Sequence, residues 1–483
     1  MLQFLNRRFK SQSGFCLFLL LSYLIFSPTV LARSAPNSAR QLALQPGLSA
    51  AHTGIQVISA QSGQTLISQN ADVPLMPASN MKVLTSAAAL SLLKPEFRFK
   101  THLLSNGYIR GNSLQGNLYL KGYGDPVLTD ERLQALVQEL KLLGVTQIQG
   151  NLIADDSFFD QERVGRGWKS TYGASAYSAQ ISALSMNLNT VEVRVRPVQV
   201  GRAAMVNLKP ENTFFEVKNQ TSTSSGRTRL KIARQLVNGK NQIIVSGNVN
   251  IQGRTEIETI NLDNPTLYVA NVAQTLLRKE GISLQGRTQL GATPSGAVIL
   301  ASTESPPLRE VVNQLNKDSV NLIAENLLKF MGANFEGVPG TAAKGGKVIL
   351  NRFLKEMVGL PSNPQLVIAD GSGLSPLNRM TANTLARVLQ YMFHQYDVSV
   401  DFMASLPISG VDGTLKKRMN TPELKRRVRA KTGFINSVSA LSGYVYTKKN
   451  QVMIFSALMN HYSNMFAATS TQEKLCQQLL NTP

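Results

Sequence analysis

The sequence is poor in cysteine and histidine. Among 483 residues there are 2 cysteines and 4 scattered histidines, and no H-E-x-x-H segment occurs. Two cysteines are too few for a disulfide-rich scaffold or a cysteine-based metal cluster, and the scattered histidines disfavour a zinc peptidase. A G-x-S-x-G segment, the nucleophile turn of α/β-hydrolases, is absent as well. We therefore expect a protein without a metal site or a cofactor.

Acidic residues are also scarce. Lys and Arg number 50 against 29 Asp and Glu, so the formal net charge is +21. Such a charge attracts polyanions such as nucleic acid, anionic lipid or an acidic wall polymer, but it does not choose among them. Gly and Pro occur in ordinary numbers, which excludes collagen-like and wholly disordered chains. The length leaves room for roughly two to four domains.

Long apolar runs are absent except near the N-terminus. Arg7, Arg8 and Lys10 precede the apolar stretch FCLFLLLSYLIFSPTVLA, and residues 1–32 contain no acid. This pattern, with small residues before its end at Ala32, is typical of a signal peptide cleaved after that residue. The alternative is a retained membrane anchor, because the run approaches the ~18 residues that can span a bilayer. We expect an exported protein with no membrane span after cleavage, and export argues against a nucleic acid partner.

Alternating apolar and polar residues indicate strands at both ends of the chain. Residues 53–70 and 439–461 each predict a hairpin. Residues 115–155 are predicted as strand, helix and strand, whereas 190–265 contains short alternating strands and a Ser/Thr-rich loop, TSTSSGRT. Helices are predicted at 79–93, 265–281, 307–330 and 345–358, with a last helix ending near Leu480. Hairpins and helices are predicted at both ends of the chain, with a different pattern between them. This suggests a split domain that carries a long insertion.

The segment Ser79-Asn-Met-Lys82 is an S-x-x-K motif at the start of a predicted helix. Residues three apart share a helix face, so the Lys82 amine can reach the Ser79 hydroxyl. A serine needs an adjacent base to act as a nucleophile, and a lysine serves as one only if its pKa is lowered. Alone the motif is weak, because an N-cap serine followed by a surface lysine has the same spacing.

Two further motifs follow in order. Ser319-Val-Asn321 is an S-x-N at a predicted helix start, and Lys431-Thr432-Gly433 leads into the C-terminal hairpin. Each is trivial alone, and a helix cap explains the S-x-N equally well. Together, and each on the element that the chemistry requires, the three motifs match the set found in penicillin-binding proteins and class A β-lactamases.

The chain resembles the class C low-molecular-mass penicillin-binding proteins, which are D-alanyl-D-alanine carboxypeptidases and endopeptidases of the penicillin-binding protein 4 type. The resemblance covers most of the chain beyond the leader. Besides the three motifs, it rests on GYGDPVLTDERL (122–133), ADDSFFD (154–160), Gly167-Trp168, ADGSGLSPLNRMT (369–381) and SLPISGVDGTLKKRM (405–419). A long insertion after S-x-x-K is a hallmark of that group, whereas class A β-lactamases lack it.

The resemblance implies three catalytic residues: Ser79 as the acylated nucleophile, Lys82 as its proton acceptor and Ser319 as a relay to the leaving amine. The residues that it implies in substrate binding are Asn321, Lys431, Thr432, Gly433, Phe434 and Asp155. Lys431 and Thr432 would bind the terminal carboxylate of the substrate. The backbone N–H groups of Ser79 and Phe434 would form the oxyanion hole.

Two of these positions need comment. Many members of the group have Ser or Thr where this chain has Phe434. The N–H is independent of the side chain, so acylation should survive, but a hydroxyl that could contact the substrate carboxylate is missing. Asp155 would contact the free amine of the third residue of the stem peptide, and the alternative is a plain aspartate at a strand end.

The implied fold is α/β (α+β), a penicillin-recognising, transpeptidase-like domain with an antiparallel sheet and flanking helices, split by a two-module insertion. The expected parts are a signal peptide (1–32), a DD-peptidase domain (33–95 and 301–483), an inserted α/β domain (96–190 and 266–300) and an inserted β-rich domain (191–265).

The predicted function is that of a serine-type D-Ala-D-Ala carboxypeptidase/endopeptidase of the periplasm, associated with the cell wall. Its partners would be peptidoglycan stem peptides and β-lactam antibiotics, which should leave a lasting adduct on Ser79. A homo-oligomer is left open. One alternative is a non-catalytic peptidoglycan-binding protein. Another is a β-lactamase or esterase of the same fold, which would release hydrolysed drug rapidly.

Overall fold

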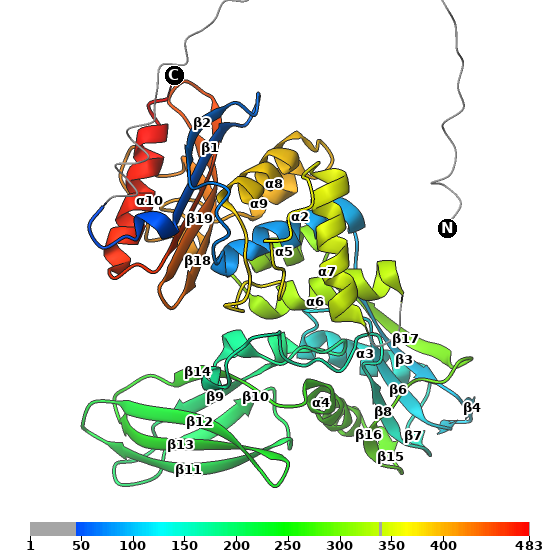
Figure 1. Ribbon diagram of the computed structural model, residues 1–483. Coiled ribbons are helices and arrows are strands. Elements are labelled where there is room, and N and C mark those ends of the chain that lie inside the picture. Colours follow the sequence, from blue (N-terminus) through cyan, green and yellow to red (C-terminus); the bar gives the residue numbers. More distant parts are fainter. Residues whose placement is uncertain (1–44, 338–340, 483) are drawn as a thin grey trace, which may run out of the picture. The chain divides into compact units, whose positions relative to one another are not determined.

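The computed structural model describes residues 45–337 and 341–482, drawn in colour in Figure 1. The predicted signal peptide lies outside the described residues. In the part of the chain that is described, no helix has both the length and the apolar character needed to cross a bilayer.

One antiparallel sheet joins the two ends of the described chain. Its strand order is β18-β19-β20-β1-β2, so that β18 forms an edge. The strands are β1 (Thr53–Ser59), β2 (Thr65–Gln69), β18 (Val428–Ile435), β19 (Val438–Tyr446) and β20 (Val452–Asn460). The early strand β1 pairs along its whole length with the late strand β20, blue beside orange in Figure 1. The hairpins predicted at 53–70 and 439–461 are confirmed.

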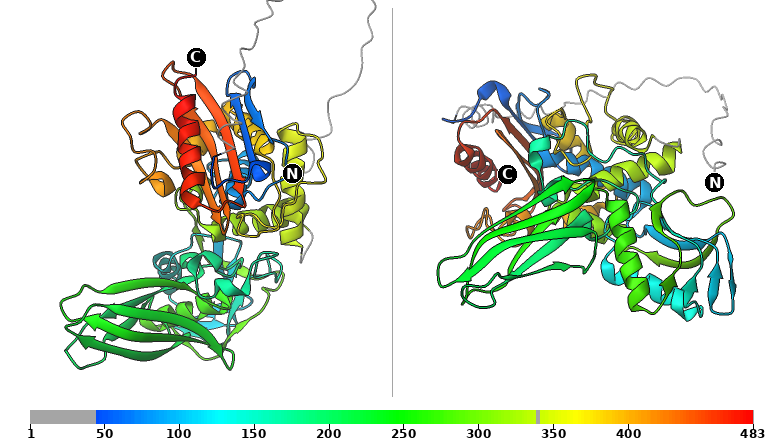
Figure 2. Two further views of the ribbon diagram at one scale, coloured as in Figure 1. Left: turned by 60° about the vertical axis from the view of Figure 1, so that its left-hand side comes forward. Right: turned by 90° about the horizontal axis from the view of Figure 1, so that it is seen from below.

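Helices cover both faces of this sheet. The last helix, α10 (Met465–Leu479), packs on one face, and α8 (Ala382–His394) contacts β1 and β20 from the other (Figures 1 and 2). The remaining helices of this region are α2 (Met81–Leu93), α5 (Leu308–Lys317), α6 (Asn321–Met331), α7 (Ala342–Arg352) and α9 (Ser399–Ser405). Nearly all of α2 is buried, which suits a sequence rich in Ala and Leu. Cys476, the single cysteine of the described chain, is buried in α10.

A mixed region lies between α2 and α5 in the sequence. It has two sheets, β16-β8-β6-β3-β17 and β15-β7-β5-β4, and two helices. Its elements are β3 (Lys100–Ser105), β4 (Tyr108–Arg110), β5 (Ser113–Gln115), β6 (Leu118–Gly122), α3 (Asp130–Leu142), β7 (Gln147–Ile148), β8 (Leu152–Asp155), α4 (Pro265–Lys279), β15 (Ser283–Leu284), β16 (Thr288–Leu290) and β17 (Val298–Glu304). The strand, helix and strand predicted within 115–155 are confirmed by β6, α3 and β8.

The remaining strands form two three-stranded sheets, β10-β9-β14 and β11-β13-β12. They are β9 (Thr190–Arg196), β10 (Met205–Lys209), β11 (Phe215–Ser224), β12 (Arg229–Val237), β13 (Lys240–Asn250) and β14 (Glu256–Asn261). The prediction of a loop at TSTSSGRT was wrong for its first half, because β11 continues to Ser224. Thr221 and Thr223 are β-branched and buried, so this half favours a strand. The domain boundaries stated above stay predictions.

Candidate active site

Ser79 lies in a single turn of 3-10 helix, η2 (Ala78–Asn80), which runs directly into α2. Its side chain is half-buried and therefore reachable from solvent, whereas Lys82, one turn later, is fully buried. Lys82 Nζ donates a hydrogen bond to Ser79 Oγ at 3.0 Å. The contact that the S-x-x-K spacing predicts is therefore present.

Two further oxygens contact the Lys82 amine. Asn321 Oδ1, from the first residue of α6, lies at 2.6 Å, and the carbonyl oxygen of Ser372 lies at 2.7 Å. Asn321 Nδ2 in turn donates to the carbonyl of Tyr177 at 2.8 Å, which fixes the orientation of the amide. Lys82 thus touches a hydroxyl, an amide oxygen and a backbone carbonyl.

Burial is the main influence on the acid–base behaviour of Lys82. It lowers the pKa of Lys82 from 10.5 to about 7, and the attraction of Asp370 and Glu325 opposes this decrease. At neutral pH a substantial share of such an amine is uncharged, so that it can accept a proton. This is the condition under which a lysine can activate a serine.

The third motif contacts the other two. Lys431 Nζ on β18 donates to Ser319 Oγ at 2.9 Å and to the carbonyl of Thr432 at 3.0 Å. Asn80 Nδ2, inside the S-x-x-K motif, donates to the carbonyl of Lys431 at 3.0 Å. Burial, together with the charge of Lys82, holds the pKa of Lys431 well below its ordinary value. Ser319 has φ of 59°, a left-handed conformation that is rare and costly for serine.

We call Ser79, Lys82, Ser319, Asn321 and Lys431 the motif cluster. Their contacts join residues that are as far as 239 positions apart in sequence. The remaining residues of the K-T-G segment lie beside it. A Cβ added to Gly433 would lie 3.0 Å from Ser79 N, so this strand approaches the turn that holds the serine very closely. Thr432 Oγ1 donates to Thr414 Oγ1 at 2.7 Å.

Phe434 and Asp155 differ from the other predicted residues. The Phe434 side chain is 44% exposed at the end of β18, next to Gly433. Asp155 is fully buried and forms an ion pair with Lys121 at 3.2 Å.

The surroundings of Asp155 explain why it stays outside the cluster. It also accepts hydrogen bonds from the backbone N–H groups of Ser157 and Thr293, at 2.9 and 2.7 Å. Burial would raise the pKa of Asp155, but these hydrogen bonds lower it on balance. Asp155 is thus held by Lys121, Ser157 and Thr293, and its contact with a substrate amine stays a prediction.

Sequence reasoning missed the loop that holds Lys82 from the other side. The sequence marks segment 370–375 only as part of a stretch that carries the resemblance, whereas in the structure its Ser372 carbonyl contacts the amine directly. Asp370 anchors the loop by accepting from the N–H groups of Gly373 and Ser375, at 2.8 and 2.6 Å. It also accepts from Trp168 Nε1 at 2.9 Å. A backbone carbonyl leaves no signature in a sequence.

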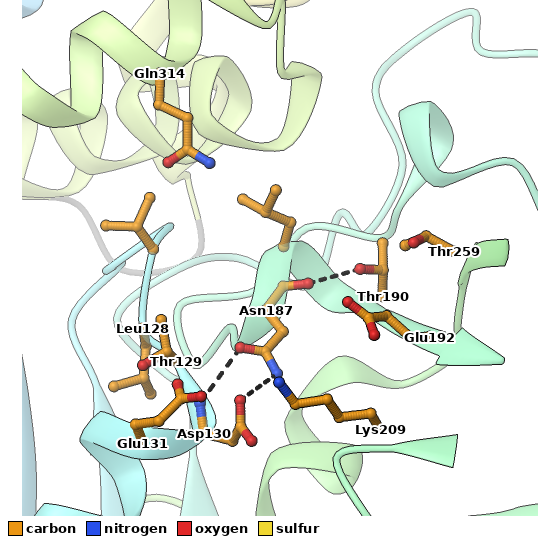
Figure 3. Close-up of a pocket in the computed structure, with 12 residues that line it drawn as sticks. Leu128, Thr129, Asp130, Glu131, Asn187, Thr190, Glu192, Lys209, Thr259 and Gln314 are labelled. Atoms are coloured by element: carbon orange, nitrogen blue, oxygen red, sulfur yellow. Dashed lines mark hydrogen bonds between the residues drawn. The ribbon is translucent and has the colours of Figure 1, made fainter. Parts of the chain in front are cut away.

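A hollow of the molecule, drawn in Figure 3, lies apart from this cluster. It has a volume of about 340 Å³ and is lined by the start of α3, the turn around Asn187, Lys209 and, from α5, Gln314. Asn187 Nδ2 donates to Asp130 Oδ1 at 2.9 Å across its floor. No residue of the motif cluster lines this pocket.

Comparisons with known proteins show the family to which the chain is similar. Residues 37–481 match the model of the D-Ala-D-Ala carboxypeptidase 3 (S13) family. The D-alanyl-D-alanine carboxypeptidase of Actinomadura sp. (strain R39) is 33% identical over 433 residues, which is 86% of this chain and 79% of that protein.

Solved structures are also similar to this chain over most of its length. The crystal structure of penicillin binding protein 4 (dacB) from Haemophilus influenzae matches with a TM-score of 0.78 and 26% identity, over 92% of this chain and 99% of that one. Its complex with a novel β-lactam matches over the same shares, with 26% identity and a TM-score of 0.74.

Proposed function

The chain belongs to the D-Ala-D-Ala carboxypeptidase 3 (S13) family, and from this we propose how its residues share the reaction. The protein is a serine-type D-Ala-D-Ala carboxypeptidase, a hydrolase of peptidoglycan with the penicillin-recognising α/β fold. The roles of single residues, endopeptidase activity on D-Ala cross-links and work in the periplasm after export are our proposals. The signal-peptide pattern at the N-terminus supports export.

The observation that carries the proposal is the set of atoms around Lys82 Nζ. An uncharged lysine amine has two N–H donors and one lone pair. Asn321 Oδ1 and the Ser372 carbonyl can only accept, so they take the two donors. The charged amine donates to Ser79 Oγ as well. Once it has lost that proton, its lone pair faces Ser79, the contact whose hydroxyl can donate. Lys82 is accordingly the base, and Ser79 the nucleophile.

The reaction proceeds in two halves. Ser79 Oγ attacks the carbonyl carbon of the penultimate D-Ala while its proton passes to Lys82, and the backbone N–H groups of Ser79 and Phe434 stabilise the oxyanion. Collapse of the tetrahedral intermediate breaks the C–N bond. Ser319 passes its proton to the leaving D-alanine and takes in return the proton that Lys82 received from Ser79, while Lys431 holds Ser319 Oγ through the 2.9 Å hydrogen bond. Water then hydrolyses the acyl-serine and frees the enzyme.

Substrate binding uses the same strand. The terminal carboxylate lies against Lys431 and Thr432, since its negative charge favours the protonated form of the buried Lys431 amine and the Thr432 hydroxyl can donate to it. Asn321 holds the backbone of the stem peptide. β-Lactams acylate Ser79 in the same way, and the similar Haemophilus protein has been solved with a β-lactam.

A fluorescent penicillin tests this proposal. We expect a covalent label that persists for many turnover times in the wild type and is abolished by Ser79→Ala. The exposed serine variant Ser463→Ala is the matched control and should label normally. Ser79→Ala should lose, together with the label, the release of D-alanine from a soluble stem pentapeptide. Absence of the label would favour the non-catalytic wall-binding alternative, and rapid release of hydrolysed drug would favour the β-lactamase alternative.

A further inference from the structure

Glu325 is a buried acid that no step above uses. It lies one turn after Asn321 on α6, four residues on, so the two side chains share a face of the helix. Its side chain is 2% exposed. Glu325 Oε1 accepts from the N–H of Ser372 at 2.8 Å, and both carboxylate oxygens lie 3.1 Å from the N–H of Gly371.

These contacts hold the peptide that precedes the carbonyl on Lys82. The Gly371–Ser372 peptide is fixed at both ends, because its N–H donates to Glu325 and its carbonyl accepts from Thr85 Oγ1 at 2.7 Å. With this peptide fixed, the next carbonyl, that of Ser372, points at Lys82 Nζ from 2.7 Å. Helix α6 therefore supplies one acceptor of Lys82 directly, through Asn321, and fastens another through Glu325.

We propose that Glu325 is a positioning residue for the base: its carboxylate holds the Ser372 carbonyl in place, and this carbonyl turns the lone pair of Lys82 toward Ser79. The inference rests on the proposed role of Lys82. Without the carbonyl, one N–H of the amine would lose its acceptor and could compete for Ser79 Oγ. The lone pair would then point to the nucleophile only part of the time, and the rate of acylation would fall.

The charges around Glu325 give the proposal a second readout. Burial and the neighbouring Asp370 raise the pKa of Glu325 to about 7, and its carboxylate raises the pKa of Lys82 against burial. The other charged group nearby is Lys329 on α6, which is paired with Asp160. A neutral residue at 325 removes the share of negative charge that Glu325 carries near and above pH 7, so Lys82 loses its proton at a lower pH.

The experiment measures the second-order rate of labelling by fluorescent penicillin between pH 5 and 9. For Glu325→Gln we expect a fall of about 10–100-fold at pH 7.5, since a misplaced base loses alignment with the serine. The acidic limb of the profile should also move to lower pH. Glu325→Asp keeps the charge but shortens the side chain, so its rate should fall while its acidic limb stays near that of the wild type.

Asp160→Asn is the matched control. Asp160 is another buried acid tied to α6 through Lys329 at 2.5 Å. It also accepts from the N–H of Ala343 on α7 at 2.6 Å, and it makes no hydrogen bond to the loop at Ser372. It should lower the melting temperature and leave the acidic limb unchanged. The inference is overturned if Glu325→Gln keeps the wild-type pH profile. It is also overturned if this variant loses rate while its acidic limb stays in place, as a merely destabilised protein would, or if its acidic limb moves no further than that of Glu325→Asp. If the wild type itself takes no label, the proposed function fails instead.

Discussion

In the mixed region between α2 and α5, buried acids lie against basic side chains, whereas the buried lysines of the motif cluster lie against neutral atoms. Asp125 pairs with Arg132 at 2.8 Å and Asp155 with Lys121 at 3.2 Å. Lys82, by contrast, contacts a hydroxyl, an amide oxygen and a carbonyl. A paired carboxylate such as Asp155 keeps its charged state, but a cation among neutral partners bears the cost of burial and tends to lose its proton.

The difference separates two uses of buried charge. In the mixed region ion pairs tie neighbouring elements together, as Lys121 on β6 does with Asp155 on β8. In the motif cluster a lowered pKa makes Lys82 available as a base near neutral pH. We therefore expect variants of the motif cluster to change the rate of acylation, and variants of the ion pairs in the mixed region to change the stability.

The largest effect is expected from Lys82→Arg. A guanidinium group keeps its proton at every pH at which the protein is folded, so it cannot act as the base. We expect the rate of penicillin acylation to fall about 10³-fold, in the range that general base catalysis contributes. Stopped-flow labelling measures this fall.

Lys329→Arg provides the control for this substitution. Lys329 is also buried, but it is paired with Asp160 and plays no part in the proposed reaction. It should label within a factor of about two of the wild type. A Lys82→Arg variant that labels within tenfold of the wild type would show that another group takes the proton from Ser79.

A smaller effect is expected when the cluster is given the ion pair that it lacks. Asn321→Asp places a carboxylate where an amide oxygen lies 2.6 Å from Lys82 Nζ. This negative charge favours the ammonium form and raises the pKa of Lys82, so the base is protonated at neutral pH. We expect acylation at pH 7 to fall about 100-fold and to recover partly as the pH rises toward 10, because one pKa unit changes the free amine about tenfold.

The pH profile of Asn321→Asp should thus move in the direction opposite to that of Glu325→Gln. Asn326→Asp makes the same chemical change on the same helix, at a side chain that donates to the Ser182 carbonyl instead of contacting Lys82. Its acidic limb should match the wild type. If Asn321→Asp lowered the rate of acylation equally at every pH, the Asn321 amide would act by its shape alone and not through the charge of Lys82.

The sequence predicted those parts of the molecule in which residues recur at a short, regular spacing along the chain. Alternation gives the hairpins, and the three-residue spacing on a helix brings Lys82 to Ser79. That the three motifs lie together was predicted from their order and from the resemblance, because contacts between residues 112 and 239 positions apart leave no local pattern in the sequence.

The remaining features depend on tertiary contacts. The Ser372 carbonyl is a backbone atom, and its position depends on a loop fastened by Glu325 and Asp370. Spacing could have drawn attention to Glu325, which is one helical turn from Asn321. The burial of Asp155 could not be read from its place at a strand end, because Lys121 and Thr293 approach it from neighbouring strands and loops.

The smallest effect on the rate, with a clear effect on stability, is expected from Lys121→Met. The change leaves the fully buried Asp155 carboxylate without its cation, although Ser157 and Thr293 still donate to it. We expect a loss of about 2–3 kcal/mol in the free energy of unfolding, below the full cost of an isolated buried charge because Lys121 is partly exposed. Lys100→Met removes an exposed partner of Glu304 from the same sheet and should cost less than about 0.5 kcal/mol. Urea denaturation measures both, and penicillin acylation of the folded variants should stay at the wild-type rate. If Lys121→Met slowed acylation without loss of stability, Asp155 would have to act on the reaction itself, and the separation between charges that hold the fold and charges that drive the chemistry would fail.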